Sequence, residues 1–319
     1  MNRKEINPAV ASVPVFLAFL SMGFGDVAGT LTDLVKQEYA LSNFMASFVP
    51  ASGFVMFGIL SVPFSLIMAR KGKKLILTLG LIIALLGLSI PIVYSFDLFT
   101  VLLLSILLLG AGAALLQVAG NPIMRDVSPE GKYSRNLSFG QFVKAIGSLS
   151  GALLPAAAAS WWGLDWKILF PIYTIAIGIT VVVLMIIPIK EKALSTNPPS
   201  VKSCLKLLGN SDIAIMVLAI FLYVGAEVSM ASKLPSYLDF NFGLDIEKLG
   251  IASVGLFFLT IMIGRFLGGI ILNWMKAPRF LLLTTVLALL GISGLFMHSQ
   301  PIAIVSIVLI GLGFANIFP

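Results

Sequence analysis

Four ionisable residues lie inside long apolar runs of this sequence: Asp26, Lys144, Glu227 and Arg265. An ionisable side chain in a membrane helix costs about 2.5–3.5 kcal/mol on insertion scales, so it normally faces a partner or a water-filled cavity. Two of the four are acidic and two are basic, so mutual pairing is electrically possible. They predict either proton and substrate chemistry within the membrane or structural ion pairs.

Asp26 and Glu227 are the candidates for proton coupling. Glu227 is about 14 residues into its apolar run, roughly 21 Å along a helix and hence near mid-depth. A carboxylate there can bind or release a proton when its solvation or its neighbouring charge changes. Asp26 follows Gly23-Phe24-Gly25, where glycines loosen a helix. The alternatives are that Glu227 is permanently paired and that Asp26 is only a structural partner of Lys144.

Polar residues at similar depth form a candidate substrate site. Gln117 and Lys144 are at similar depths in consecutive runs, with Asn121 and Gln141 nearby. An amide both donates and accepts hydrogen bonds, which suits sugar hydroxyls. Tyr223 offers an aromatic surface. Interhelical packing by the amides is an equally good interpretation. Lys144 can donate a hydrogen bond to a sugar hydroxyl, pair with a carboxylate of the protein or bind an anionic substrate.

The elements that must position these residues are membrane helices. The 319 residues are 59% hydrophobic and 11% charged, against about 45–50% and 25% in soluble domains, and the mean hydropathy is +1.05. We predict an all-α polytopic membrane protein whose partner is the lipid bilayer. The net charge of +7 is split into short clusters, which excludes a nucleic-acid partner. About ten spans are expected: 9–35, 44–68, 75–94, 98–123, 137–160, 167–189, 213–238, 249–275, 280–297 and 301–319.

Enzyme chemistry has little to draw on. The sequence holds one cysteine, Cys204, and one histidine, His298, far apart in the chain. Metal ligation and nucleophilic catalysis normally need clusters of such residues. There is also no P-loop motif for ATP. We therefore expect no enzyme activity, no catalytic residue, no cofactor and no metal.

Lysine and arginine are distributed unevenly between the connections. Only Lys36, Lys167 and Lys248 fall on one side of the predicted topology, and most of the others fall on the opposite side. The positive-inside rule then places the N-terminus in the cytoplasm of a multi-pass protein of the cytoplasmic (inner) membrane. Four basic residues are candidates for a gating or structural charge. One is Arg265 within a span, and the other three, Arg70, Lys73 and Lys74, lie in the basic loop after the second span.

A polar segment after the sixth span divides the chain. We predict an N-terminal six-helix bundle over 1–189, a cytoplasmic linker over 190–212 and a C-terminal bundle of four helices over 213–319. Offsets near two hundred residues superpose Gly110-x-Gly112 on Gly311-x-Gly313, which indicates an internal repeat typical of transporters. The second bundle then lacks two helices, so we expect a fragment of a twelve-span protein; a ten-span protein is the alternative.

Several segments resemble the major facilitator superfamily and, within it, the fucose:proton symporter family of sugar permeases. The resemblance rests on Gly110-Ala111-Gly112, 116–122, Arg135-Asn136-Leu137, 221–227, 264–268 and 311–319. The chain departs from that family at three places. Gln117 replaces a glutamate, as in hexose-type members; Lys144 replaces a usual asparagine; and Ala69 stands where the acidic residue before the basic loop is expected.

The resemblance implies two six-helix bundles in the complete protein, with a substrate site between them and a monomeric state. It implies proton-coupled import of a monosaccharide by alternating access, with Asp26 and Glu227 as proton-coupling residues. Import of an anionic substrate such as a sugar acid, through Lys144 and Arg265, is the alternative. Efflux of amphipathic compounds and a non-transporting membrane sensor are further interpretations.

Overall fold

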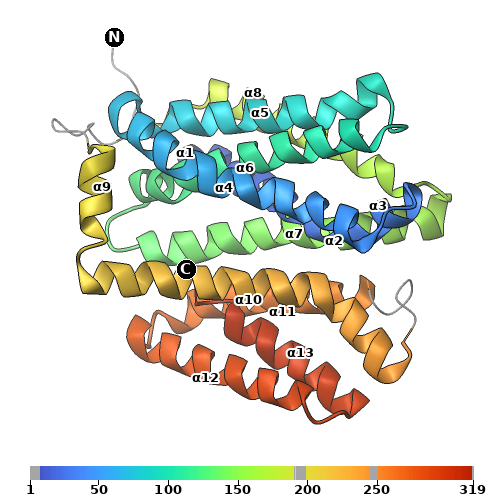
Figure 1. Ribbon diagram of the computed structural model, residues 1–319. Coiled ribbons are helices and arrows are strands. Elements are labelled where there is room, and N and C mark those ends of the chain that lie inside the picture. Colours follow the sequence, from blue (N-terminus) through green and yellow to red (C-terminus); the bar gives the residue numbers. More distant parts are fainter. Residues whose placement is uncertain (1–7, 190, 192–198, 245–250, 318–319) are drawn as a thin grey trace.

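The computed structural model describes residues 8–189, 191, 199–244 and 251–317, and these are helical with no strand among them (Figure 1). Within the described residues, nine helices are long and apolar enough to cross a membrane, and a shorter apolar helix follows. The prediction of an all-α polytopic membrane protein with about ten spans is confirmed. The first of the nine spans Val10–Thr30. The others are α4 (Asn43–Lys71), α5 (Lys73–Tyr94), α6 (Phe99–Val127), α7 (Tyr133–Trp162), α8 (Leu169–Ile186), α10 (Ser211–Phe242), α11 (Ile251–Ile271) and α12 (Ala277–Leu295), and the shorter helix is α13 (Gln300–Phe314).

The first predicted span is a broken helix rather than one continuous rod. It consists of α1 (Pro8–Gly23), a 3-10 turn (Phe24–Asp26), α2 (Val27–Thr30) and α3 (Thr32–Glu38). Gly23 lies directly against the backbone of α7, because a Cβ there would be 2.9 Å from the Cα of Gly147. Small residues such as glycine let two helix backbones approach this closely. Asp26, three residues later, contacts Lys144 and Ser148 of α7.

Two hydrophobic cores are present. The first is built from α1 to α8, which we call the N-terminal half, with large buried side chains such as Phe19 and Tyr173. The second is built mainly from α10 to α13, the C-terminal half, around Phe257 and Phe314. In Figure 1 the orange-to-red C-terminal half lies along one side of the green α7.

Between the halves, α9 (Val201–Leu207) occupies part of the segment predicted as the linker 190–212. Ser200 caps it, accepting a hydrogen bond from the amide of Ser203 at 3.2 Å. Residues 190 and 192–198 of that segment lie outside the described residues, as do Arg3 and Lys4, Lys248 and 318–319. The domain boundaries at 189 and 213 stay a prediction.

The glycines that indicated a repeat pack in corresponding ways. A Cβ on Gly112 of α6 would lie 2.6 Å from the Cβ of Ala84 on α5. A Cβ on Gly313 of α13 would lie 2.7 Å from the Cβ of Ala288 on α12. Each glycine therefore allows the fourth helix of its half to pack closely on the third.

The two halves meet where α7 packs against α11. Phe266 of α11 has its ring centroid 6.1 Å from that of Phe139 and 5.6 Å from that of Phe142, both on α7. Glycine opposite a small side chain brings the helices together one turn further, where a Cβ on Gly269 would lie 3.4 Å from the Cβ of Ser138. This interface positions the charged residues described next.

Candidate functional site

The first ion pair joins α1–α2 to α7 within the N-terminal half. The Nζ of Lys144 lies 3.3 Å from Oδ2 of Asp26, and the Oγ of Ser148 donates a hydrogen bond of 2.7 Å to the same oxygen. Ser148 is one helical turn after Lys144, so both side chains reach Asp26 from one face of α7. The two side chains are only partly covered, at 17% exposed for Lys144 and 27% for Asp26.

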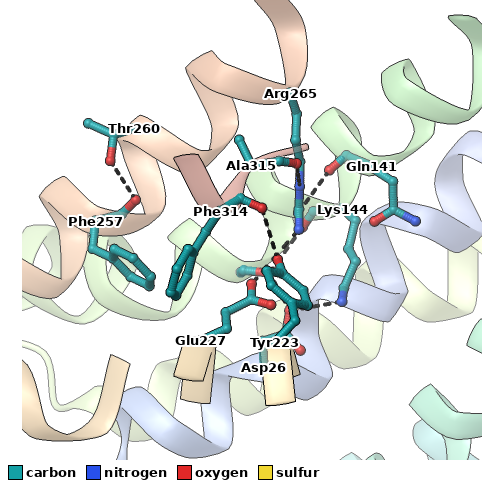
Figure 2. A network of polar contacts seen from close by, with 11 residues as sticks. Asp26, Gln141, Lys144, Tyr223, Glu227, Phe257, Thr260, Arg265, Phe314 and Ala315 are labelled. Carbon is teal, nitrogen blue, oxygen red and sulfur yellow. Dashed lines mark hydrogen bonds and ion pairs between the residues drawn. The ribbon is translucent and has the colours of Figure 1, made fainter. Parts of the chain in front are cut away.

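The second ion pair lies in the C-terminal half and reaches across the interface (Figure 2). Nη2 of Arg265 on α11 is 3.8 Å from Oε1 of Glu227 on α10. The same guanidinium donates through Nε to the carbonyl of Ala315 at 3.3 Å and through Nη1 to the carbonyl of Gln141 at 3.4 Å. Because Gln141 is on α7, Arg265 links three helices of two halves, and it is buried.

The predicted substrate amides lie together on α6 and α7. Gln141 is buried, and its Nε2 donates to Oδ1 of Asn121 at 3.5 Å. Gln117 lies one turn before Asn121 on α6, and its Oε1 is buried with no hydrogen-bond partner among the described residues. A buried acceptor without a donor destabilises a structure by about 1–3 kcal/mol. Gln117 thus offers an unused acceptor one turn from Asn121 on α6.

Tyr223 is on α10, one turn before Glu227, and is buried. Its hydroxyl donates to the carbonyl of Phe314 at 3.1 Å, and its ring packs against the ring of Phe314 with centroids 5.6 Å apart. These contacts anchor α10 to α13 within the C-terminal half. A substrate contact by Tyr223 stays a prediction.

The sequence profile of the Major Facilitator Superfamily matches residues 15–319. The chain belongs to the Major Facilitator Superfamily. It is therefore a multi-pass membrane transporter protein, and the resemblance to this superfamily drawn from the sequence motifs is confirmed.

Relatives and solved structures agree with this assignment. The chain is 24% identical over 330 residues to a glucose/galactose transporter of Brucella abortus biovar 1, a match that covers 98% of this chain and 79% of the relative. The fold matches the crystal structure of FucP in the outward conformation with a TM-score of 0.75 and 19% identity, covering 97% of this chain and 82% of that one. It also matches a structure of the E. coli fucose:proton symporter FucP with a TM-score of 0.69 and 19% identity, covering 96% and 82%.

The basic loop of this superfamily member is held by acidic residues that sequence reasoning did not select. Lys73 forms an ion pair with Asp126 at the end of α6, whose side chain is buried. The carboxylate of Glu191 accepts from the backbone amide of Lys73 at 2.5 Å and of Lys74 at 3.1 Å, which caps the start of α5. Arg70 is exposed. Ala69 carries no acid, and the loop is instead held by Asp126 of α6 and by Glu191, which follows α8, at places that no local motif marks.

Ser148 was also missed, although it has a sequence signal. It is four residues after Lys144 and therefore on the same face of a helix. A serine on that face has a hydroxyl that can reach a carboxylate held by the lysine. All four charged residues predicted from the sequence are brought into the two pairs. Gln141 is linked to Arg265 through its carbonyl and to Asn121 through its side chain.

Proposed function

We propose that this transporter imports a neutral monosaccharide together with protons, by alternating access across the cytoplasmic membrane. The observation that carries the proposal is that two ion pairs, one in each half, meet at the turn of α7 that carries Gln141, whose side chain donates to Asn121. A relative that bears the name glucose/galactose transporter supports a hexose as substrate. FucP, a fucose:proton symporter, supports coupling to protons.

The amides and the Asp26–Lys144 pair are the proposed sugar ligands. Gln117 supplies an acceptor without a partner, and Asn121 supplies an amide bonded only at 3.5 Å to Gln141. Sugar hydroxyls both donate and accept, so they satisfy such groups without carrying charge. Gln141 is buried and holds α6 and α7 together, so its proposed contribution is through its contact with Asn121.

Alternating access requires the two halves to separate at one end and close at the other. The bond from Arg265 to the carbonyl of Gln141 crosses the boundary, so the halves cannot separate at this level while it persists. The rings of Phe139, Phe142 and Phe266 close the same interface further along α7. We assign Arg265 a gating role, and the Lys73 pair and the Lys74 cap a structural role in fixing the loop between α4 and α5.

The uneven distribution of lysine and arginine supports a cytoplasmic N-terminus. We propose further that the protein works as a monomer, as the resemblance implies, with its two bundles joined by the linker over 190–212. Protons enter from the outside and bind a carboxylate of the site. Neutralising that carboxylate removes a fixed charge before the halves rock. Release of the sugar and the proton to the inside then restores the ion pair.

The test is the external pH of a weakly buffered suspension of cells that produce the protein, after addition of hexoses, 6-deoxyhexoses and hexuronates in turn. We expect alkalinisation with glucose or galactose, abolished by a protonophore. Silence toward every neutral sugar, with the protein shown to be in the membrane, would contradict proton symport of these sugars.

A second candidate function is import of a sugar acid. Lys144 favours it, because this ammonium is 17% exposed in the site and shares its ion pair with a single described carboxylate. Protonation of Asp26 would free the ammonium for a substrate carboxylate. In the same assay, a response to a hexuronate without a response to glucose or galactose would select this candidate.

A further inference from the structure

We propose that the two ion pairs divide the work of coupling: Glu227 carries the proton, and the Asp26–Lys144 pair stays charged and opens only around the substrate. This assignment rests on the proposed function of sugar–proton symport. It follows from what each carboxylate holds in place and what its loss would leave behind.

Asp26 is held as a carboxylate by two donors. Lys144 lies 3.3 Å from its Oδ2, and Ser148 donates to the same oxygen at 2.7 Å. Protonating Asp26 would leave the ammonium of Lys144 without this counter-charge in a largely covered position. Removing one partner of a buried ion pair is strongly destabilising because the remaining charge is uncompensated. The pair is therefore stable in its charged form until hydroxyl groups replace the contacts between its members.

Glu227 is held less tightly, and its partner does not depend on it. Its distance to Arg265 is 3.8 Å, the longest of the contacts made by that guanidinium. Arg265 keeps two main-chain acceptors, the carbonyls of Ala315 and Gln141, when Glu227 is neutral. A guanidinium is always protonated, so Arg265 is a fixed charge beside the carboxylate of Glu227. Glu227 can therefore cycle between its two forms without leaving a cation unbonded.

The charged and titratable neighbours of Glu227 come from several elements. Tyr223 lies one turn earlier on α10, and Arg265 faces it from α11. Asp26 and Lys144 lie in the same cluster from the N-terminal half (Figure 2). The Asp26–Lys144 pair has no net charge, so it adds little to the electrostatic field at Glu227. Arg265 is thus the charge that Glu227 responds to most directly.

The proton site and the substrate site are connected through α7. The carbonyl of Gln141, which Arg265 binds, is one helical turn before Lys144, which holds Asp26. When Glu227 is protonated, Arg265 is held only by main-chain acceptors, one of them on α7. A change at Glu227 therefore alters how strongly Arg265 binds the carbonyl of Gln141, on the turn of α7 that precedes Lys144. This is the physical link that symport requires between proton and sugar.

The experiment compares two transport modes of the purified full-length protein in proteoliposomes, with labelled D-galactose and D-glucose as probes. Counterflow exchanges sugar for sugar and needs no proton gradient, whereas accumulation needs an imposed gradient. For Glu227→Gln we expect counterflow close to that of the wild type, independent of pH, and no accumulation. For Asp26→Asn we expect counterflow to fall about tenfold or more.

Matched controls remove a carboxylate elsewhere on the same elements. Asp239→Asn on α10 and Asp33→Asn on α3 each delete one exposed negative charge away from the pairs, and we expect both modes to be unchanged. Asp26→Glu keeps the charge and should retain part of the counterflow. The double variant Asp26→Asn with Lys144→Gln removes the uncompensated charge, so it should fold while still failing in counterflow.

The outcomes separate the two proposals. If wild-type protein accumulates neither sugar with a proton gradient, the proposed function fails. If the wild type accumulates galactose and Glu227→Gln does so too, or if Asp26→Asn exchanges sugar normally but no longer accumulates it, the division of roles is wrong and Asp26 is the proton carrier.

Discussion

Replacing Gly23 with alanine tests whether the close contact between α1 and α7 sets the geometry of the Asp26–Lys144 pair. The Cβ of an alanine would lie 2.1 Å from the carbonyl oxygen of Lys144 and 2.9 Å from the Cα of Gly147. Carbon–oxygen contacts of this kind are normally about 3.3–3.6 Å long, so the helices must move apart by roughly 1.2–1.5 Å. These neighbours are backbone atoms, so no side-chain rotation can relieve the contact.

The expected loss of stability is about 1–3 kcal/mol, the usual range for overpacking a close-packed interface. The same movement lengthens the Ser148–Asp26 hydrogen bond from 2.7 Å to beyond about 3.3 Å, outside the ordinary range for O–H···O bonds. Gly23→Ala should therefore lower both thermal stability and sugar exchange. At about 2 °C per kcal/mol for a chain of this length, Tm should fall by roughly 2–6 °C.

The assay is thermal unfolding in detergent together with galactose counterflow in proteoliposomes. Gly29→Ala is the matched control, because Gly29 belongs to α2 of the same broken helix and has nothing within 4 Å of its Cβ position. Alanine is favoured over glycine in helices by about 1 kcal/mol, so the control should be neutral or slightly stabilising. Equal Tm and equal exchange for the two variants would refute the reasoning.

Three further predictions concern the ends of the helices. Asp126→Asn should lower stability by about 3 kcal/mol because it leaves Lys73 without its ion pair, and thermal unfolding should show a smaller loss when Lys73→Gln is added. Glu191→Ala should lower stability by about 1–2 kcal/mol, as loss of a helix cap does; an unchanged Tm would contradict the capping role. Burial raises the pKa of Tyr39 above its ordinary value of 10.0, and the hydroxyl donates to the carbonyl of Phe96. Its stabilising contribution should be complete below the unfolded pKa and lost as pH rises through the folded pKa, so alkaline titration of Tm should fall more steeply for the wild type than for Tyr39→Phe.

Local hydropathy located the helices well. The spans expected at 75–94 and 98–123 correspond to α5 (Lys73–Tyr94) and α6 (Phe99–Val127). This works because each span must be apolar over the thickness of the bilayer whatever its neighbours are. The first span, expected at 9–35, corresponds to a candidate span over Val10–Thr30 that contains a 3-10 segment at Phe24–Asp26, next to the glycines that the sequence marked.

The candidate site was predicted in composition and only partly in arrangement. The charges of Asp26, Lys144, Glu227 and Arg265 indicated pairing, because unpaired charges are costly in a membrane. Which acid joins which base is a matter of helix packing, as is the use of the carbonyl of Gln141 by Arg265. The acidic partners of the basic loop were missed for the same reason, since Asp126 and Glu191 come from distant parts of the chain.

The sequence by itself determined that this protein is a bundle of membrane helices with a small set of charges near mid-depth, because hydropathy and ionisation are properties of the residues. It also carried the motifs by which the superfamily is recognised. Only the tertiary structure decided that Asp26 pairs with Lys144 within one half and that Glu227 shares an arginine bonded to the other half. Those distances arise where glycines and aromatic rings of separate helices meet, so they exist only after the chain has folded.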